Sequence, residues 1–284
     1  PENSLKESTM HCESSSAQEI RKVLAITSEL PWPLNTGGHI RSFHIFRSLA
    51  KQFDLRVLAG VSRRSDEGVE RLRAEGINVC PVELADRDPQ SEIKRVLNAA
   101  VRREPYVMFR RHDRPEFRLA VRQQLAKRTP DLVYLDHLDP FSFRDLFPES
   151  QIVCDLHNVY STLAARVAEE RRWPVSIYLR REAKLLSEME QAVAQRASTL
   201  MTVSAEEQTH FRELGAGDVH LVPNGVDCAA WSDFPIGRTA KPPVILYLGA
   251  LSWQPNAKAA EFLARDVMPP VSYTHLRAHE TVRN

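Results

Sequence analysis

The sequence lacks several features that would place it in a particular class of protein. Its 284 residues contain no apolar run long enough to cross a bilayer, and no signal peptide is visible, so we expect a cytoplasmic protein. The four cysteines are far apart and form no C-x-x-C pair, which disfavours a zinc site and suits a reducing compartment. The formal net charge is only +1, which does not indicate a nucleic-acid-binding protein.

Several motifs that carry chemistry are missing as well. The chain contains neither a G-x-G-x-x-G dinucleotide fingerprint nor a Walker A loop. No Ser-His-Asp or Cys-His set has the spacing expected of a nucleophilic catalyst. The residues that directly follow predicted strands therefore carry most weight, because ligands of open parallel sheets bind at the carboxyl ends of the strands.

What the sequence does contain is a regular alternation of strand-like and helix-like segments. Seven apolar, β-branched runs are typical of strands: residues 23–27, 55–59, 77–82, 131–136, 151–156, 199–203 and 219–222. Helices are expected between them: residues 38–52, 66–75, 91–103, 114–128, 161–196 with a break near Trp173-Pro174, and 205–214. This alternation predicts an α/β fold in which helices cover both faces of a parallel sheet.

The order of these segments predicts one complete domain and the start of another. The seven strands fill a Rossmann-like domain at residues 21–227, and residues 228–243, which contain three prolines, are expected to be a linker. A new strand is expected from Val244 and a helix over residues 256–267. These would form the first βα unit of a second α/β domain at residues 244–270.

Both ends of the chain differ from the rest in composition. Residues 1–20 are polar and rich in serine, so we expect disorder there, and Met10 is a candidate for the true start. Residues 271–284, VSYTHLRAHETVRN, resemble a peptide translated from a sequencing adapter. We therefore expect a non-native tail and a truncated gene product.

The basic residues are concentrated in one stretch, Lys94–Arg128. It has eleven Lys and Arg against three Asp and Glu, a local charge of 11 − 3 = +8, which leaves 1 − 8 = −7 for the remainder. Two interpretations stay open: a solvated helical face, or a patch for an anionic partner such as a phospholipid surface or a phosphorylated acceptor. We expect the apolar side chains of Val96, Leu97, Val101 and Leu119 to face the sheet and the arginines to point outward.

The loop after the first strand contains two adjacent glycines, Gly37 and Gly38, directly before a helix. Glycine lets a backbone approach a ligand closely, and the free N–H groups of a helix N-terminus favour an anion. The sequence therefore predicts an anion site here. The alternative is that the two glycines only allow a tight turn.

Histidines follow the fourth and fifth strands, in the stretches LDHLDP and DLHN. Because these strands are expected to be neighbours, His137 and His157 should face one crevice, where an imidazole can donate a hydrogen bond to a phosphate or to developing charge. They could also be ordinary polar loop residues. A metal site formed with Asp136 and Asp139 is a further, weaker interpretation.

The order of the motifs resembles the retaining glycosyltransferases of family 4, which have the GT-B fold. The resemblance rests on the Gly-Gly loop followed by LDHLDP, DLHN, TVSAEEQ, VPNGVD and LYLGALSWQPNAKAAEFL. The last of these, with Trp253 and Pro255-Asn256, is similar to members that build bacterial exopolysaccharide or cell-envelope glycans. The similarity extends from about Lys22 to Pro270.

The resemblance implies transfer of a sugar from a nucleotide-sugar, the co-substrate, to a glycan or lipid-linked acceptor. The configuration would be retained, with no essential metal or other cofactor. The domain at residues 21–227 would mainly hold the acceptor. A lipid-linked acceptor would agree with peripheral contact between the basic stretch Lys94–Arg128 and the anionic inner face of the membrane.

The resemblance also assigns roles to the residues at the strand ends. Gly37 and Gly38 match the loop that contacts the donor diphosphate. His137 matches a residue that lies over the reacting sugar, and His157 the second candidate catalytic position. Asn158 borders the same cleft. Asp136 is a further candidate for lining the cleft or contacting the acceptor.

The sequence also departs from the family pattern. Ala250 stands where the family usually has an Arg, and Lys258 is not a convincing match for the family's Lys. The E-x7-E element of the family's second domain is expected beyond Pro270 and is not found there. We therefore expect this chain to be an inactive fragment. Two alternatives stay open: a non-catalytic α/β protein that binds an anion, and a GT-B sugar-nucleotide epimerase, which should have acidic catalytic residues in the crevice.

Overall fold

The computed structural model describes residues 20–61, 66–147, 151–229, 232, 245–251 and 254–269. The chain divides into two compact units, Pro1–Gly225 and Val226–Asn284, which are described separately. The expected disorder at residues 1–19, most of the expected linker and the expected tail at 271–284 lie outside the described residues.

The first unit contains a seven-stranded sheet in the order β3-β2-β1-β4-β5-β6-β7, and every pairing is parallel. This confirms the predicted α/β fold. The strands are β1 (Lys22–Thr27), β2 (Asp54–Val61), β3 (Val79–Glu83), β4 (Leu132–Asp136), β5 (Gln151–Leu156), β6 (Thr199–Thr202) and β7 (Val219–Leu221). The chain adds strands outward from β1 in one direction and from β4 in the other. The switch point, where ligands bind in such sheets, therefore lies between β1 and β4.

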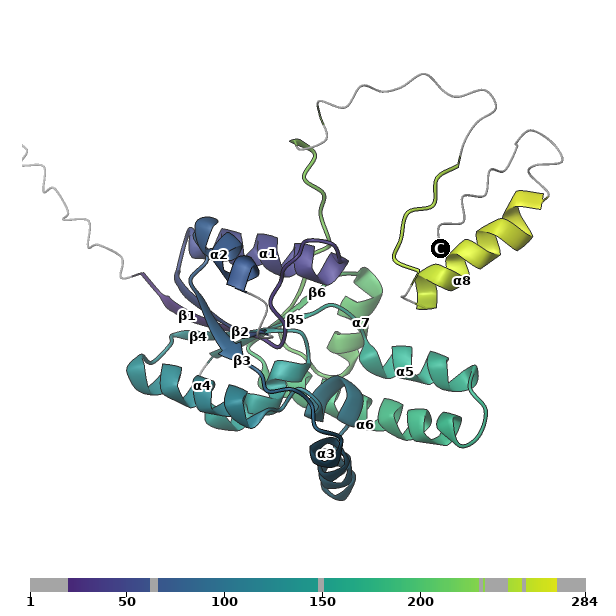
Figure 1. Cartoon of the computed structure of the whole chain (residues 1–284), viewed down its shortest axis with the longest axis horizontal. Coiled ribbons are helices and arrows are strands. Elements are labelled where there is room, and N and C mark those ends of the chain that lie inside the picture. The colour runs from purple at the N-terminus through teal and green to yellow at the C-terminus, as the bar shows by residue number, and fades with distance from the viewer. Residues whose placement is uncertain are drawn as a thin grey trace, which may run out of the picture. The chain divides into compact units, whose positions relative to one another are not determined.

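Helices cover both faces of this sheet (Figure 1). They are α1 (Gly37–Ala50), α2 (Asp66–Ala74), α3 (Pro89–Arg102), α4 (Pro115–Lys127), α5 (Tyr160–Glu169), α6 (Val175–Arg196) and α7 (Ala205–Glu213), with a π-helical turn η1 (Tyr106–Arg110) and a 3-10 helix η2 (Asp139–Leu146). The break predicted near Trp173-Pro174 separates α5 from α6. The 3-10 helix was not predicted.

The core consists of two layers, one on each face of the sheet. Along β1, Val23 and Ala25 belong to the layer that includes side chains of α1 and α2, whereas Leu24 and Ile26 belong to the layer that includes side chains of α4, α6 and α7. Because successive residues of a strand point to opposite faces, a strand buried on both sides must be apolar throughout. This is why the strands were recognisable as continuous apolar runs.

Local signals fix the ends of several helices. Thr36 caps α1, and its side chain accepts a hydrogen bond from the backbone N–H of His39. Ser204 caps α7 by accepting from the N–H of Glu207, which confirms one half of the predicted capping box, whereas the Glu207 side chain accepts from the N–H of Val203. Gly76, with φ of +82°, follows α2 in the left-handed conformation that glycine adopts without strain.

The second unit corrects one prediction. The strand expected from Val244 is not formed where the structure describes this segment, since residues 245–248 have no regular conformation. A strand needs a neighbour to accept its N–H bonds and donate to its carbonyl oxygens, and no strand pairs with this segment in the described part of the chain. The expected helix is present as α8 (Gln254–Phe262) and a π-helical turn, η4 (Leu263–Val267).

The basic stretch Lys94–Arg128 also differs from the prediction. Arg110 pairs with Glu104 and Asp113, and Arg118 lies 2.6 Å from Asp113. Further ion pairs join Arg118 to Asp145, Arg114 to Glu116 and Arg128 to Asp54. Several of the arginines expected to point outward are therefore neutralised within the domain.

The apolar side chains of this stretch were predicted to face the sheet, and that prediction was wrong. Val96, Leu97, Val101 and Leu119 are all exposed. Helical spacing shows which residues share a face but not which face is inside. In α3 the buried contact is made by the small residue Ala99, and in α4 by Phe117 and Val121.

Candidate active site

The two histidines singled out from the sequence lie together at the carboxyl ends of β4 and β5. These strands pair directly, with Asp136 opposite Asp155 in the ladder. His137 directly follows the last residue of β4, and His157 directly follows the last residue of β5. The centroids of the two imidazole rings are 3.8 Å apart. The neighbouring strand ends therefore bring both rings to one point, as the sequence predicted.

Two buried carboxylates hold the imidazole of His157. Its Nε2 lies 3.4 Å from Asp136 Oδ1 and 3.3 Å from Asp155 Oδ2. Burial lowers the pKa of His157, but the two carboxylates outweigh it and raise that pKa to about 9. Burial likewise raises the pKa of Asp136, and the neighbouring imidazoles outweigh this and lower it to about 2. His157 is thus a cation at neutral pH.

Helix α1 supplies the remaining partners of these carboxylates. Ser42 Oγ donates to Asp136 Oδ1 at 3.0 Å. Arg41 donates from Nε and Nη2 to both oxygens of Asp155, at 2.9 Å and 2.6 Å, and from Nη1 to the carbonyl oxygen of Val222 at 2.6 Å. The buried face of α1 is therefore partly polar.

Sequence reasoning missed Arg41. The side chain is buried although arginine is almost never fully buried without a partner. Its partner Asp155 is 114 residues away in the sequence. A signal was present: Arg41 lies directly before Ser42 and Phe43, among residues that helical spacing places on the inner face. The spacing alone could not identify Asp155.

His137 has a different electrostatic state. Burial lowers its pKa, so the ring is neutral at pH 7. Its Nδ1 lies 3.2 Å from the hydroxyl oxygen of Tyr160, which in turn interacts with the side chain of Asn158. A neutral imidazole whose Nδ1 accepts from the Tyr160 O–H carries its single ring proton on Nε2.

Gly38 lies where these groups converge. A Cβ on Gly38 would lie 3.8 Å from Cε1 and 3.9 Å from Nε2 of His137, and 3.9 Å from Nδ1 of His157. A Cβ on Gly37 would have no neighbour within 4 Å. The N-terminal N–H groups of α1, the neutral His137 and the charged His157 therefore surround one small space. Such a set of donors suits an anion.

The same cluster was tested as a metal site. Ligand atoms of Asp136, His137 and His157 lie within 4.8 Å of one another. However, a metal needs the neutral form of histidine, and His157 is held protonated by two carboxylates. Asp139, the fourth residue considered, is hydrogen-bonded to Ser28 instead. Nε2 of His157 is already held by two carboxylates, so a metal ion would have to displace its proton in order to bind there.

The remaining sequence candidates have clear positions. Asp136 is buried beneath His157 and does not reach the surface. Asn158 is exposed at the start of α5. Asn158 is therefore accessible to a ligand, whereas Asp136 acts on the site through its contact with His157.

A family model described as Glycosyltransferase Family 4 matches residues 58–230, more than half of the chain. The chain belongs to glycosyltransferase family 4. The family 4 match includes His137, His157 and Asn158 and begins after the loop of Gly37 and Gly38. No curated protein matches the sequence significantly.

Solved structures give a more distant likeness. The N-terminal domain of trehalose-6-phosphate phosphatase from Candida albicans is 18% identical, with a TM-score of 0.41, over 73% of this chain and 49% of that one. Sucrose-phosphate synthase from Thermosynechococcus elongatus is 12% identical, with a TM-score of 0.41, over 74% and 92%. UGT89C1 of Arabidopsis thaliana, solved with UDP, is 13% identical, with a TM-score of 0.40, over 76% and 56%.

The chain thus spans about half the length of the first and third of these structures. At these identities and TM-scores the likeness carries no argument about individual residues of the family 4 chain.

Proposed function

We propose that this chain is the acceptor-side domain of a retaining family 4 glycosyltransferase. The donor is a nucleotide-sugar and the acceptor a glycan or a lipid-linked glycan, as in exopolysaccharide or cell-envelope synthesis. One observation carries the proposal. His137 Nε2, His157 Nδ1 and the N-terminus of α1 converge at Gly38, in a member of family 4.

The chemistry of these groups suits the departure of a nucleoside diphosphate. When the bond between sugar and diphosphate breaks, the leaving oxygen gains negative charge. The charged His157 and the N–H groups of α1 stabilise that charge, and the neutral His137 donates from Nε2 to an oxygen of the sugar or the diphosphate. Since His157 already supplies a positive charge, the reaction is expected to need no metal.

The protonation of the buried carboxylates distinguishes the epimerase alternative from glycosyl transfer. A sugar-nucleotide epimerase would need a carboxyl group that can take up or release a proton in the crevice. Asp136 and Asp155 are both buried, and the partners of each outweigh its burial and lower its pKa. They are therefore poor acid–base groups, which favours glycosyl transfer. The other alternative, a non-catalytic anion-binding protein, is tested by the sugar-transfer assay below.

The first test measures binding of a nucleoside diphosphate by ¹⁵N NMR of the imidazoles. We expect UDP or GDP to shift the ¹⁵N resonances of His137 and His157 and to leave the resonances of the exposed His220 unchanged. Gly38→Ala should weaken this binding, because its methyl group would lie against the ring nitrogens His137 Nε2 and His157 Nδ1. The matched control is Gly37→Ala, whose methyl group meets nothing within 4 Å. Equal effects of the two variants, or no shift with any nucleoside diphosphate, would contradict the proposed site.

The second test measures transfer of radiolabelled sugar. We expect no turnover from this chain alone, because Ala250 stands where the family usually has an Arg. Turnover would show that the chain needs no arginine at this position. In any active form, His137→Ala should lower turnover by about a hundred- to thousandfold, the usual effect of losing one donor to developing charge. Loss of acceptor binding with unchanged turnover at saturation would instead make His137 an acceptor contact.

A further inference from the structure

Helix α3 presents an apolar face to solvent. Ile93, Leu97 and Val101 are spaced four residues apart and are 62%, 60% and 83% exposed. Side chains at this spacing form one stripe along a helix. Val96 lies beside the stripe and is exposed as well. The buried contact of α3 is made by Ala99 on another side of the helix, so the stripe contributes nothing to the core.

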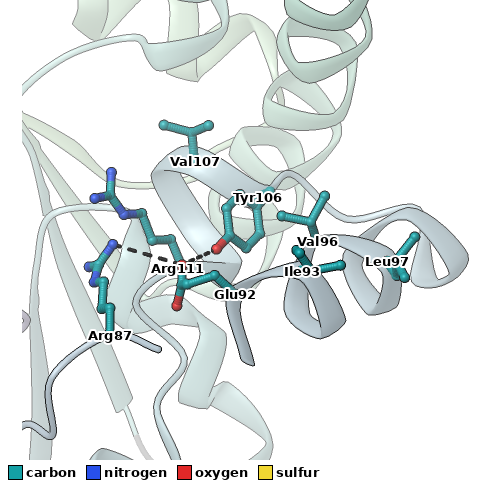
Figure 2. A pocket seen from close by; sticks show the side chains of 8 residues that line it. All are labelled: Arg87, Glu92, Ile93, Val96, Leu97, Tyr106, Val107 and Arg111. Carbon is teal, nitrogen blue, oxygen red and sulfur yellow. Dashed lines mark hydrogen bonds and ion pairs between the residues drawn. The ribbon is translucent and has the colours of Figure 1, made fainter. Parts of the chain in front are cut away.

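A hollow beside α3 extends this apolar surface. A cavity of about 480 Å³ lies between α3 and η1, and it shares no residue with the candidate active site. Figure 2 shows Ile93, Val96 and Leu97 along α3, with Tyr106 and Val107 on η1. Arg87, Glu92 and Arg111 complete one side of the hollow, where Arg87 lies 4.0 Å from Glu92. The surface is therefore apolar in the middle, and Arg111 supplies a positive charge at its margin.

A second exposed apolar segment lies on the neighbouring helix α6. Trp173, two residues before the start of α6, is 78% exposed, and Val175 and Ile177 are exposed in the first turn of α6. Helix α6 reaches α3 further along, where Arg181 Nη2 donates to the carbonyl oxygen of Ala100 at 3.5 Å. Trp173 is preceded by Arg171 and Arg172. Both helices thus combine exposed apolar side chains with arginines.

We propose that the α3 stripe (Ile93, Leu97 and Val101), with Val96 beside it, docks on an anionic phospholipid leaflet and inserts these side chains at the boundary between headgroups and acyl chains. A helix with an apolar face and basic flanks lies in this region of a bilayer. Trp173, on α6, is of the residue type that anchors proteins at the same depth. This docking does not depend on the proposed sugar transfer, although a lipid-linked acceptor would be reached from such a surface.

The charges around the stripe favour an anionic phospholipid surface over a second copy of the chain. The basic residues Lys94, Arg102, Arg103 and Arg111 are exposed, and the structure records no ion pair for them among the described residues. They are therefore available to anionic headgroups, unlike Arg110 and its neighbours. A second copy of the chain would bring the same cations face to face across a symmetric contact, which opposes dimerisation through this face.

The test is flotation of the whole chain with vesicles of phosphatidylglycerol and phosphatidylcholine, without donor or acceptor. We expect binding to the anionic vesicles, little binding to pure phosphatidylcholine, and weaker binding as salt rises. Leu97→Ser should reduce the partition coefficient about tenfold or more, because a leucine side chain no longer leaves water. Adding Val101→Ser should reduce it further. Circular dichroism should show unchanged helix content, since both side chains are exposed.

The chain offers a matched control in Leu119, which lies on α4 in the same basic stretch and is 57% exposed. Leu119→Ser leaves the charge unchanged, as Leu97→Ser does, and should bind vesicles like the unmodified chain. Equal losses in the two variants, or no loss in either, would overturn insertion through α3. No binding to anionic vesicles at low salt would overturn docking itself. A dimer in sedimentation velocity that Leu97→Ser abolishes would show that the face joins two copies instead. None of these results depends on the nucleoside diphosphate titration, so the two proposals can fail separately.

Discussion

The charge on His157 should make the stability of the first unit depend on pH in a specific window. The pKa is raised from 6.5 to about 9 in the folded state, where burial lowers it and Asp136 and Asp155 more than compensate. A pKa raised on folding means that the protonated form stabilises the folded state. The contribution is fully present below pH 6.5, the unfolded value, and is lost as the pH rises through about 9.

The magnitude follows from the size of the shift. The difference between 6.5 and about 9 corresponds to roughly 3 kcal/mol, at about 1.4 kcal/mol per pKa unit. The side chain of His157 is almost fully buried, so solvent screening reduces this little. Most of the stabilisation remains at pH 7 and almost none at pH 10.

The experiment compares urea unfolding of the unmodified chain and of His157→Gln. We expect the variant to lose about 2–3 kcal/mol more at pH 7 than at pH 10, because glutamine carries no charge to lose. The control is His220→Gln, since His220 lies 3.0 Å from Asp218 but both are exposed. Such a surface pair contributes only about 0–1 kcal/mol. If the cost of His157→Gln were the same at both pH values, the assigned ion pair would be wrong.

Three further predictions concern the surroundings of this pair. Arg41→Met should lower the free energy of unfolding by about 3–5 kcal/mol in urea, because it leaves the buried Asp155 without its guanidinium partner. Gly60→Ala should lower the melting temperature sharply, because its Cβ would lie 2.2 Å from the carbonyl oxygen that directly follows β1. Tyr160→Phe should leave the fold intact but change the ¹⁵N shifts of His137, because Nδ1 loses its hydrogen-bond partner.

The sheet could be predicted from the sequence because each strand carries its own signal. The fifth strand was placed at its observed bounds, Gln151–Leu156, and the others within one or two residues at each end. A strand buried on both faces must be apolar at every position, and that property is visible in five or six consecutive letters. The convergence of His137 and His157 followed from the same argument, because neighbouring parallel strands end at one edge.

The errors arose where a partner distant in the sequence decides the outcome. The apolar stripe of α3 was assigned to the core because periodicity reveals a face without revealing what covers it. The strand expected from Val244 has an apolar sequence but no strand beside it in the part that the structure describes. Arg41 was overlooked because its role is set by Asp155, and no local pattern connects a helix to a strand 114 residues away.

Several unfavourable features of the first unit lie at the end of the sheet where the two histidines are found. His137 has φ of +78°, a conformation that non-glycine residues rarely adopt, and its backbone is held there because its N–H donates to the carbonyl oxygen of Asp155 at 2.9 Å. Asp136, Asp155 and Arg41 are buried charges, which cost desolvation even when they are paired. A sheet that needed only stability would have apolar residues at these positions. The strained backbone and the buried charges instead fix one neutral and one charged imidazole beside Gly38, a set of donors that suits the diphosphate of the proposed donor.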